Sequence, residues 1–158
     1  MKLYIKQKLF SWNDRFSVYD STGREIYHIK GALFSFGNKL TVYDAGDREV
    51  CRIEQELFRL RQRYHVIKNE QCMATVIKEF SLFRPYYTIE GPDWEMQGDF
   101  LSHDYEILDG EKCIASVQKQ WFTWGDTYEV DVNERDCDPI TAMAIAIIID
   151  CVLDSQDD

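Results

Sequence analysis

Histidines are the side chains best suited to acid–base chemistry near neutral pH, and this sequence has three, far apart in the chain: His28, His65 and His103. His28 and His65 fall in segments with the alternating pattern of strands, whereas His103-Asp104 lies at an expected turn. A lone His-Asp dipeptide is weak evidence for a metal-dependent phosphohydrolase, which needs several further ligands. The motifs G-x-S-x-G, H-E-x-x-H, G-x-x-x-x-G-K and G-x-G-x-x-G are all absent. We therefore expect no catalytic residue, no metal site and no cofactor.

Carboxylates and thiols are more numerous but no more specific. Many acidic residues fall at expected turns, where an Asp side chain accepts hydrogen bonds from the backbone that follows it. Paired carboxylates of the kind used by glycosidases cannot be singled out among so many. The cysteines are odd in number and form no C-x-x-C pair, which argues against a disulfide framework and a zinc ribbon. We expect reduced thiols in a cytoplasmic protein at all five positions: Cys51, Cys72, Cys113, Cys137 and Cys151.

Basic residues form one cluster in an otherwise acidic chain. The formal net charge of −10 disfavours general binding to nucleic acid, because the protein as a whole repels polyphosphate. Arginine can hold a phosphate or a carboxylate through two parallel hydrogen bonds. The alternative interpretation is a solvated surface in which the arginines pair with nearby glutamates such as Glu54 and Glu56. The candidate ligand-binding residues are Arg59, Arg61 and Arg63, together with Lys78 and Arg84 on neighbouring strands.

A repeat of 24 residues organises the chain. The segment Phe10-Ser-Trp12 recurs as Phe34-Ser-Phe36, then as Phe58-Arg-Leu60, and again near the end as Phe122-Thr-Trp124. In each copy, alternating apolar residues flank a turn, which is typical of a β-hairpin. Gly31 is expected to mark a bend in one of the longer strands. Two-residue hairpin turns are expected at Asn13-Asp14, Gly37-Asn38 and Gly125-Asp126.

The repeat predicts an all-β domain that spans residues 1–158. A propeller is disfavoured, because its blades need four strands per unit. The expected antiparallel strands, about twelve in number, are 2–12, 15–20, 24–36, 39–44, 48–60, 63–68, 72–83, 86–90, 94–100, 103–108, 112–124 and 127–133.

The last segment departs from this pattern and predicts a helix over 139–153. Asp138 is a suitable N-cap, and Pro139 stands where the first position of a helix tolerates proline. The segment is apolar on every side, so it must be buried in the protein or in a membrane. Its length of roughly 22 Å is short for a hydrocarbon core of roughly 30 Å, and Asp150 lies within it. Because twelve strands enclose more space than their side chains fill, we expect a closed barrel around this helix, with no transmembrane segment.

Several motifs resemble the LURP-one-related family, whose domain has the Tubby C-terminal-like fold also found in phospholipid scramblases. They are Gly98-Asp99-Phe100, then Tyr105-Glu-Ile, the stretch from Lys119-Gln-Trp121 to Tyr128-Glu-Val, and Ala144-Ile-Ala-Ile-Ile-Ile-Asp150. The resemblance covers nearly the whole chain and implies a twelve-stranded barrel around a C-terminal helix. Tubby proteins bind phosphoinositides through basic residues, and scramblases act on lipids. The family implies no settled activity.

These observations predict a non-enzymatic intracellular binding or scaffold domain that recognises a phospholipid headgroup or another anionic ligand. Two alternatives are a protein-interaction module without a small ligand and a small-molecule hydrolase with unrecognised carboxylates. The partners expected are therefore an anionic ligand or a protein, and not nucleic acid. Because the N-terminal MKLYIKQKLF has no apolar run of signal-peptide length, we expect a cytoplasmic location.

Overall fold

The computed structural model of this chain describes residues 1–7, 14–32, 38–120 and 127–154. Within these ranges lie twelve strands and one helix. The strands are β1 (Lys2–Gln7), β2 (Asp14–Tyr19), β3 (Glu25–Ala32), β4 (Lys39–Asp44), β5 (Glu49–Glu56), β6 (Arg63–Lys68), β7 (Gln71–Lys78), β8 (Tyr87–Glu90), β9 (Trp94–Asp99), β10 (Asp104–Asp109), β11 (Lys112–Gln120) and β12 (Thr127–Val132), and the helix is α1 (Pro139–Asp154).

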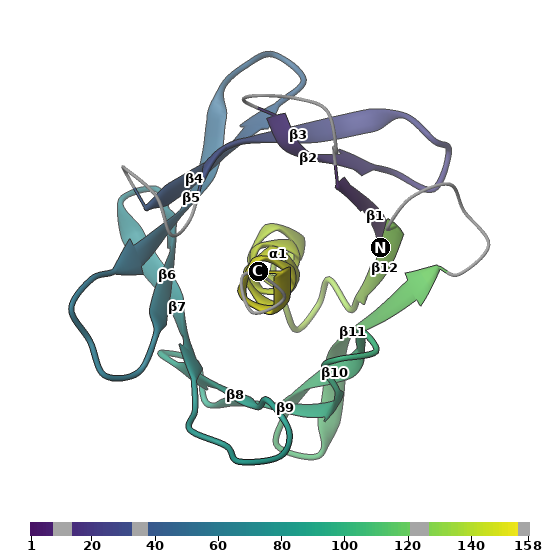
Figure 1. The fold of residues 1–158 in the computed structure, drawn as a ribbon. Helices are drawn as coiled ribbons and strands as arrows, with labels where there is room; N and C mark the ends of the chain where they lie inside the picture. The colour runs from purple at the N-terminus through teal and green to yellow at the C-terminus, as the bar shows by residue number, and fades with distance from the viewer. Residues whose placement is uncertain (8–13, 33–37, 121–126, 155–158) are drawn as a thin grey trace.

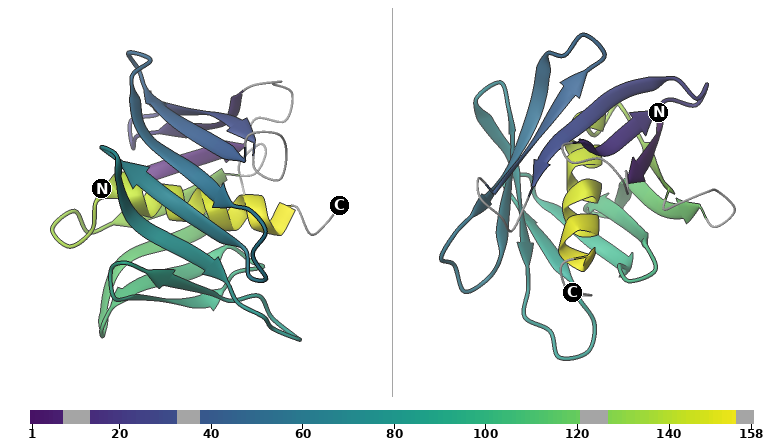
Figure 2. Two further views of the ribbon diagram at one scale, coloured as in Figure 1. Left: turned by 90° about the vertical axis from the view of Figure 1, so that its left-hand side faces the viewer. Right: turned by 45° about the horizontal axis from the view of Figure 1, so that its top comes forward.

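All twelve strands join one antiparallel sheet that curls into a barrel around α1 (Figure 1). Each strand pairs with its neighbours in sequence, except that β8 does not pair with β9, and β1 pairs with β12, so the sheet runs from β8 round through β1 to β9. The predicted barrel is confirmed, with one difference: it is nearly closed. Among the described residues no ladder joins β8 to β9, although the two strands lie side by side (Figures 1 and 2).

The 24-residue repeat places equivalent side chains at equivalent positions of the barrel wall. In three successive copies the same two positions are fully buried: Phe16 and Val18, Leu40 and Val42, Tyr64 and Val66. Side chains alternate between the two faces of a strand, so these positions face inward while the residues between them face outward. A sequence repeat of this kind therefore specifies the register of one hairpin after another.

The helix fills the barrel, as predicted (Figure 2). It begins at Pro139, and the carbonyl of Asp138 accepts the first helical hydrogen bond from the amide of Ala142 at 3.1 Å. Its side chains from Thr141 to Leu153 are all buried. Four isoleucines of the predicted helix are completely buried: Ile145, Ile147, Ile148 and Ile149. A helix that is apolar all round is thereby removed from water on every side.

Two strands end earlier than predicted, and the residues wrongly assigned to them include several apolar ones. The segments predicted as strands 48–60 and 72–83 pair only as far as Glu56 and Lys78. The apolar residues beyond these points are exposed in loops 57–62 and 79–86. Alternating apolar residues normally indicate a buried strand face, and here they continue past the end of the sheet.

Gly31 in β3 has the conformation that a bend requires. Its φ is 109°, in a region that L side chains rarely adopt, and a Cβ at this position would collide with the carbonyl of Lys39. The other hairpin features predicted from the repeat lie outside the described residues, at least in part. They are the turns Asn13-Asp14, Gly37-Asn38 and Gly125-Asp126 and the aromatic residues Trp12, Phe36 and Trp124.

The two ends of the barrel differ. The turn end, next to the start of α1, consists of residues 20–24, 45–48, 69–70, 91–93, 110–111 and 133–138. The loop mouth, next to the end of α1, consists of residues 57–62, 79–86 and 100–103 (Figure 2).

Candidate functional site at the loop mouth

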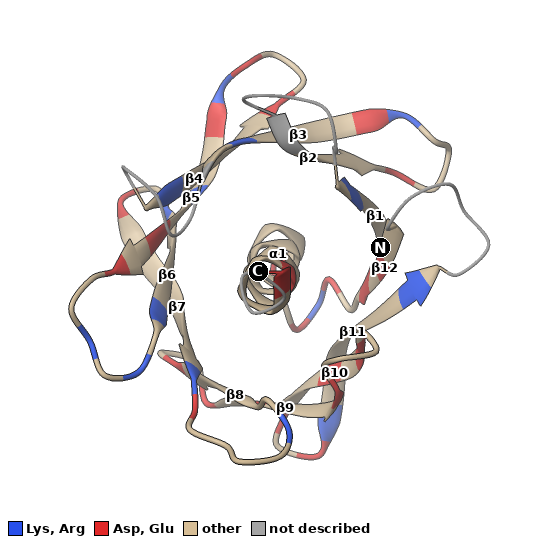
Figure 3. Ribbon diagram, in the orientation of Figure 1, with Lys and Arg blue, Asp and Glu red and all other residues tan. Residues whose placement is uncertain are grey.

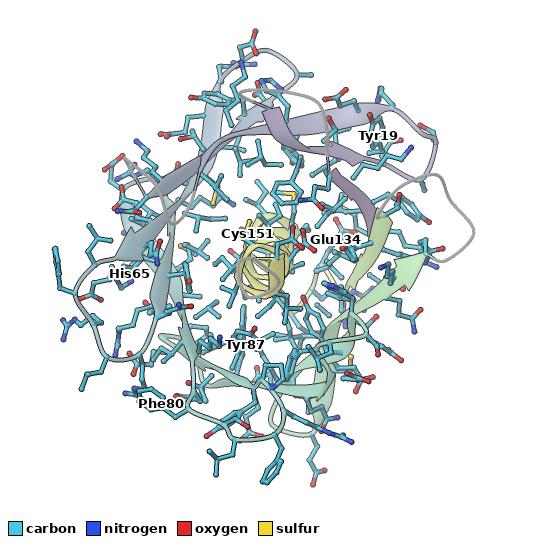
Figure 4. All side chains as sticks on the ribbon, viewed as in Figure 1. Tyr19, His65, Phe80, Tyr87, Glu134 and Cys151 are labelled. Atoms are coloured by element: carbon cyan, nitrogen blue, oxygen red, sulfur yellow. The ribbon has the colours of Figure 1, made fainter. Side chains whose placement is uncertain are left out.

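Exposed apolar side chains are concentrated at the loop mouth. Phe58 and Leu60 on the β5–β6 loop are almost completely exposed to solvent, and so are Leu82 and Phe83 on the β7–β8 loop. Figure 4 shows Phe80, on the same β7–β8 loop, pointing away from the barrel, whereas Tyr87 points inward. Three more exposed apolar residues belong to this end of the barrel: Leu57, Tyr86 and Leu101. Large exposed apolar patches on a folded protein usually mark an interaction site.

The three predicted arginines lie together on the β5–β6 side of the loop mouth. Arg59, Arg61 and Arg63 line a hollow of about 300 Å³ with Phe58 and Leu60. Arg63 lies at the start of β6 with its side chain on the outer face, and the other two belong to the loop. Figure 3 shows the basic residues of this loop on the outer side of the barrel.

Each of these arginines also contacts a carboxylate. The Arg59 guanidinium donates to Glu56 at 2.6 Å. Arg61 donates to both oxygens of Glu79 at 2.8 and 3.0 Å, and Arg63 donates to Glu90 at 2.6 Å. Hydrogen bonds from Arg59 and His65 hold the pKa of Glu56 below its usual range, and hydrogen bonds from Thr88 and Arg61 do the same for Glu79. The pairing with glutamates considered from the sequence is therefore present, although with Glu56, Glu79 and Glu90 and not with Glu54.

Lys78 and Arg84 differ from the three arginines, because no carboxylate lies within salt-bridge distance of either among the described residues. Lys78 is the Cα partner of Tyr87, and directly paired residues point to the same face of a sheet. The lysine therefore lies on the inner side of the barrel wall, partly buried, and this burial lowers its pKa. Arg84 lines a second hollow, of about 240 Å³, with Asp99 and Ser102.

The turn end has the opposite charge. Its carboxylates outnumber its arginines, and it contains no lysine. Cations close to it are paired, as shown by Lys68 with Asp138 at 2.9 Å and Lys112 with Asp136 at 2.7 Å. At the described part of the loop mouth the balance is reversed, because three arginines, Arg59, Arg61 and Arg84, outnumber the one carboxylate, Glu79, although Glu56 and Asp99 border this end. Among the described residues the loop mouth is therefore less acidic than the turn end.

Beneath the loop mouth, a polar pair lies among aromatic rings. Asp150 of α1 is 2% exposed, and its carboxylate lies 3.9 Å from Nε2 of His103. The ring of Phe100 packs 5.1 Å from those of Tyr87 and Tyr105, measured between centroids. Burial raises the pKa of Tyr105 well above its usual value, and the charge of Asp150 adds to this effect. The acidic neighbour of His103 in space is thus Asp150, and not Asp104 as the sequence suggested.

The remaining candidates for chemistry are scattered. No group of three or more His, Cys, Asp or Glu residues in the described part of the chain is arranged to hold a metal ion. Cys72 and Cys113 are exposed, and their thiols donate to the carbonyls of Ala74 and Ala115 at 3.5 Å. Burial raises the pKa of Cys51 and of Cys137 to about 12, so neither is an activated thiol.

Sequence reasoning found the basic residues of this end but missed its apolar ones. All five predicted ligand-binding residues lie around the loop mouth, on two sides of it: Arg59, Arg61, Arg63, Lys78 and Arg84. Phe58, Leu60, Leu82 and Phe83 were assigned to strands. The alternation Phe58-Arg59-Leu60-Arg61 is a signal that could have revealed them, because it fits a half-buried strand and an exposed amphipathic loop equally well.

The chain matches the model of the LURP-one-related family over residues 1–150. It belongs to this family. It is also 34% identical over 158 residues to the "Uncharacterized protein YxjI" of Bacillus subtilis (strain 168), a match that covers 100% of this chain and 97% of the relative. The sequence resemblance to LURP-one-related proteins is thereby confirmed.

A solved structure shares the fold. The X-ray structure of a protein from Arabidopsis thaliana matches with a TM-score of 0.60 and 14% identity, and the match covers 99% of this chain and 91% of that one. At this identity the likeness shows the fold alone, a Tubby-like barrel. No helix among the described residues of our LURP-one-related protein is long and apolar enough to cross a membrane.

Proposed function

We propose that this LURP-one-related protein is a non-enzymatic intracellular binding domain, formed by residues 1–158, that holds a phosphate-bearing anionic ligand at the loop mouth. The ligand chemistry is that of a phospholipid headgroup, which a free phosphate compound shares. Arg59, Arg61 and Arg63 supply guanidinium groups on one side of the mouth, and Lys78 and Arg84 supply cations on the other.

The observation that carries this proposal is the state of Lys78 and Arg84. The chain contains 28 acidic residues, yet among the described residues no carboxylate lies within salt-bridge distance of either cation, and only at longer range does Arg84 act on a carboxylate, that of Asp99. Partial burial of the Lys78 ammonium costs free energy that no nearby carboxylate offsets. A bound anion close to Lys78 would remove this cost, and Arg84 is a second available cation at a separate hollow that it shares with Asp99.

The three ion-paired arginines are compatible with the same role. Exposed ion pairs contribute roughly 0–1 kcal/mol, so at Arg59, the most exposed of the three, a ligand phosphate can replace the glutamate at little cost. Arg59 and Arg61 keep 58% and 41% of their side-chain surface exposed and can reach a ligand from the solvent side. Arginine can also hold a phosphate and a carboxylate at once, through different N–H groups.

Charge removal tests the proposal. We would measure binding at low salt to vesicles of phosphatidylcholine with phosphatidylglycerol, and to soluble glycerophosphoglycerol by calorimetry. The variants are Lys78→Ser with Arg84→Ser, and Arg59→Ser with Arg61→Ser and Arg63→Ser. Each cation near an anionic surface contributes about 1 kcal/mol, so each variant should bind at least about tenfold more weakly.

The matched control removes the same charge from the other end. Arg24, Arg48 and Arg135 are exposed arginines of the turn end, and their triple replacement by Ser has the same net charge as the triple variant of the loop mouth. The control should bind as the unmodified protein does. If neither anionic vesicles nor the soluble headgroup bind at low salt, the proposed function is wrong. Turnover in a hydrolase screen that EDTA abolishes would contradict the non-enzymatic role.

A further inference from the structure

The most exposed apolar side chains of this protein lie at the tips of two neighbouring loops. Phe58 and Leu60, like Leu82 and Phe83, expose more than nine tenths of their surface to solvent. Side chains with such exposure rest on no neighbour, so they add nothing to the stability of the fold. Each also leaves a large apolar surface in water, which is unfavourable in solution and favourable for binding.

Cations alternate with these apolar residues along the chain. Arg59 lies between Phe58 and Leu60, and Arg84 follows Phe83 directly. This mixture of apolar tips and adjacent cations is characteristic of protein surfaces that lie in the interface between lipid headgroups and acyl chains. The cations meet the headgroups while the apolar side chains reach the layer below them.

We propose that the loop mouth docks end-on to an anionic phospholipid bilayer, with the tips of the β5–β6 and β7–β8 loops inserted into its interfacial layer. The acidic turn end then faces away from the lipid. This inference rests on the proposed function and specifies its ligand as a membrane lipid and not a free phosphate compound.

The geometry favours a bilayer over a protein partner. A protein that buried Phe58 and Leu60 together with Leu82 and Phe83 would need a fitted pocket for each, on loops from two different hairpins. A fluid lipid layer adapts to any arrangement of tips. The charge distribution gives the same orientation independently, because the basic mouth is attracted to an anionic surface that repels the acidic turn end.

The experiment compares apolar variants that leave every charge in place. Flotation with phosphatidylcholine–phosphatidylglycerol vesicles would be measured for Phe58→Ser with Leu60→Ser, and for Leu82→Ser with Phe83→Ser. The control is Met73→Ser, at an exposed apolar residue of β7 away from the loop mouth. Each loop variant should lower the partition coefficient roughly tenfold or more, whereas the control should leave it unchanged. Part of the binding by the unmodified protein should persist at high salt, which weakens attraction between charges but not apolar insertion.

A probe on the loop reports insertion directly. Leu82→Cys would be labelled with bimane in a protein whose exposed thiols are removed by Cys72→Ser and Cys113→Ser. Its emission should shift to the blue on anionic vesicles and be quenched by lipids that carry a nitroxide high in the acyl chain. The same label at Met73→Cys should show neither effect.

The outcomes separate this inference from the proposed function. If the loop variants bind vesicles as the unmodified protein does, or if glycerophosphoglycerol binds while vesicles do not, insertion is wrong and anion binding stands. If vesicles bind through the apolar loops and the cation variants have no effect, anion binding is wrong and insertion stands alone. Sedimentation that shows a dimer, converted to a monomer by the loop variants, would identify a second copy of this chain as the occupant and overturn the proposal.

Discussion

The connections at the turn end and at the loop mouth join the same strands but differ in character. At the turn end, polar groups satisfy one another locally. Oδ1 of Asp20 accepts the amides of Thr22 and Arg24 at 2.9 and 3.0 Å, and Oδ1 of Asp44 accepts the equivalent amides of Gly46 and Arg48 at 2.8 and 3.0 Å. At the loop mouth, loops 57–62 and 79–86 instead hold apolar side chains out in water.

This difference separates residues that stabilise the fold from residues available for binding. A turn whose hydrogen bonds are satisfied within five residues has little capacity left for a partner. Loops that expose apolar and basic groups gain from a partner, and they are positioned by a rigid barrel that does not depend on them. Replacements at the turn end should therefore change stability, and replacements at the loop mouth should change binding.

The largest effect on stability should come from a change in the core, which supports both ends of the barrel. Ile148→Asp would bury an unpaired carboxylate at a fully buried position, at a cost of several kcal/mol against a total stability of roughly 5–15 kcal/mol. The protein should become insoluble or lose cooperative unfolding in urea, monitored by near-UV circular dichroism. Ile148→Val is the control and should cost about 0.5–1.5 kcal/mol.

Deletion of residues 139–158 should be more damaging than Ile148→Asp. The barrel would lose the side chains that fill it, and its apolar inner wall would be exposed to water. A truncated protein that is more soluble, still folded and unchanged in its near-UV spectrum would show that the two ends do not depend on a shared core.

Stability should fall at both extremes of pH. Hydrogen bonds from nearby side chains and backbone lower the pKa of Asp20 and Asp44 below 3.8. These two carboxylates therefore stabilise the folded state above pH 3.8, and this stabilisation is lost as the pH falls through their folded-state pKa. Burial raises the pKa of Cys51 and Cys137 from 9.0 to about 12, and that of Tyr87 from 10.0 to about 12. The folded state keeps these three groups protonated, so their stabilisation of the fold is present below pH 9 and is lost as the pH rises toward 12. Urea midpoints across this range should form a plateau between about pH 5 and 9.

Variants that change only one end of the barrel should differ in their melting temperatures. Asp20→Ala with Asp44→Ala should lower the melting temperature, by roughly 2–4 °C for each kcal/mol lost, because the turn amides lose their acceptors. Leu82→Ser with Phe83→Ser should leave the melting temperature unchanged, because these side chains are almost fully exposed. A loss of stability in the loop variant equal to that in the turn variant would contradict the division of roles.

The smallest effect concerns thiol accessibility. Cys72 and Cys113 are exposed and should react first with a thiol reagent in the folded protein. Buried Cys51, Cys137 and Cys151 should react only after urea unfolds the barrel. Mass spectrometry after timed alkylation would count the modified thiols. A stoichiometric disulfide in freshly purified protein would contradict the expected reducing compartment.

Local pattern was enough to predict the barrel wall and its filling. Phe16, Leu40 and Tyr64 recur at one interval because each copy of the repeat presents the same inward position, and strand alternation makes this visible in the sequence. The helix was predictable for the same reason, since a segment from Pro139 that is apolar on every side has to be enclosed. The basic cluster was also visible, because charge is a property of the residues themselves.

What depended on distant parts of the chain was decided only by the tertiary structure. Phe58 and Leu82 have the composition of strand residues, and they are exposed because β5 and β7 end before them. His103 meets Asp150, and Arg63 meets Glu90, only because the curvature of the sheet and the path of α1 bring them together. The sequence by itself determined which side chains must be buried, because the hydrophobic effect acts on composition and local periodicity. The tertiary structure decided which end of the barrel exposes apolar and basic groups, because the ends of strands are set by pairing with their neighbours and not by the residues alone.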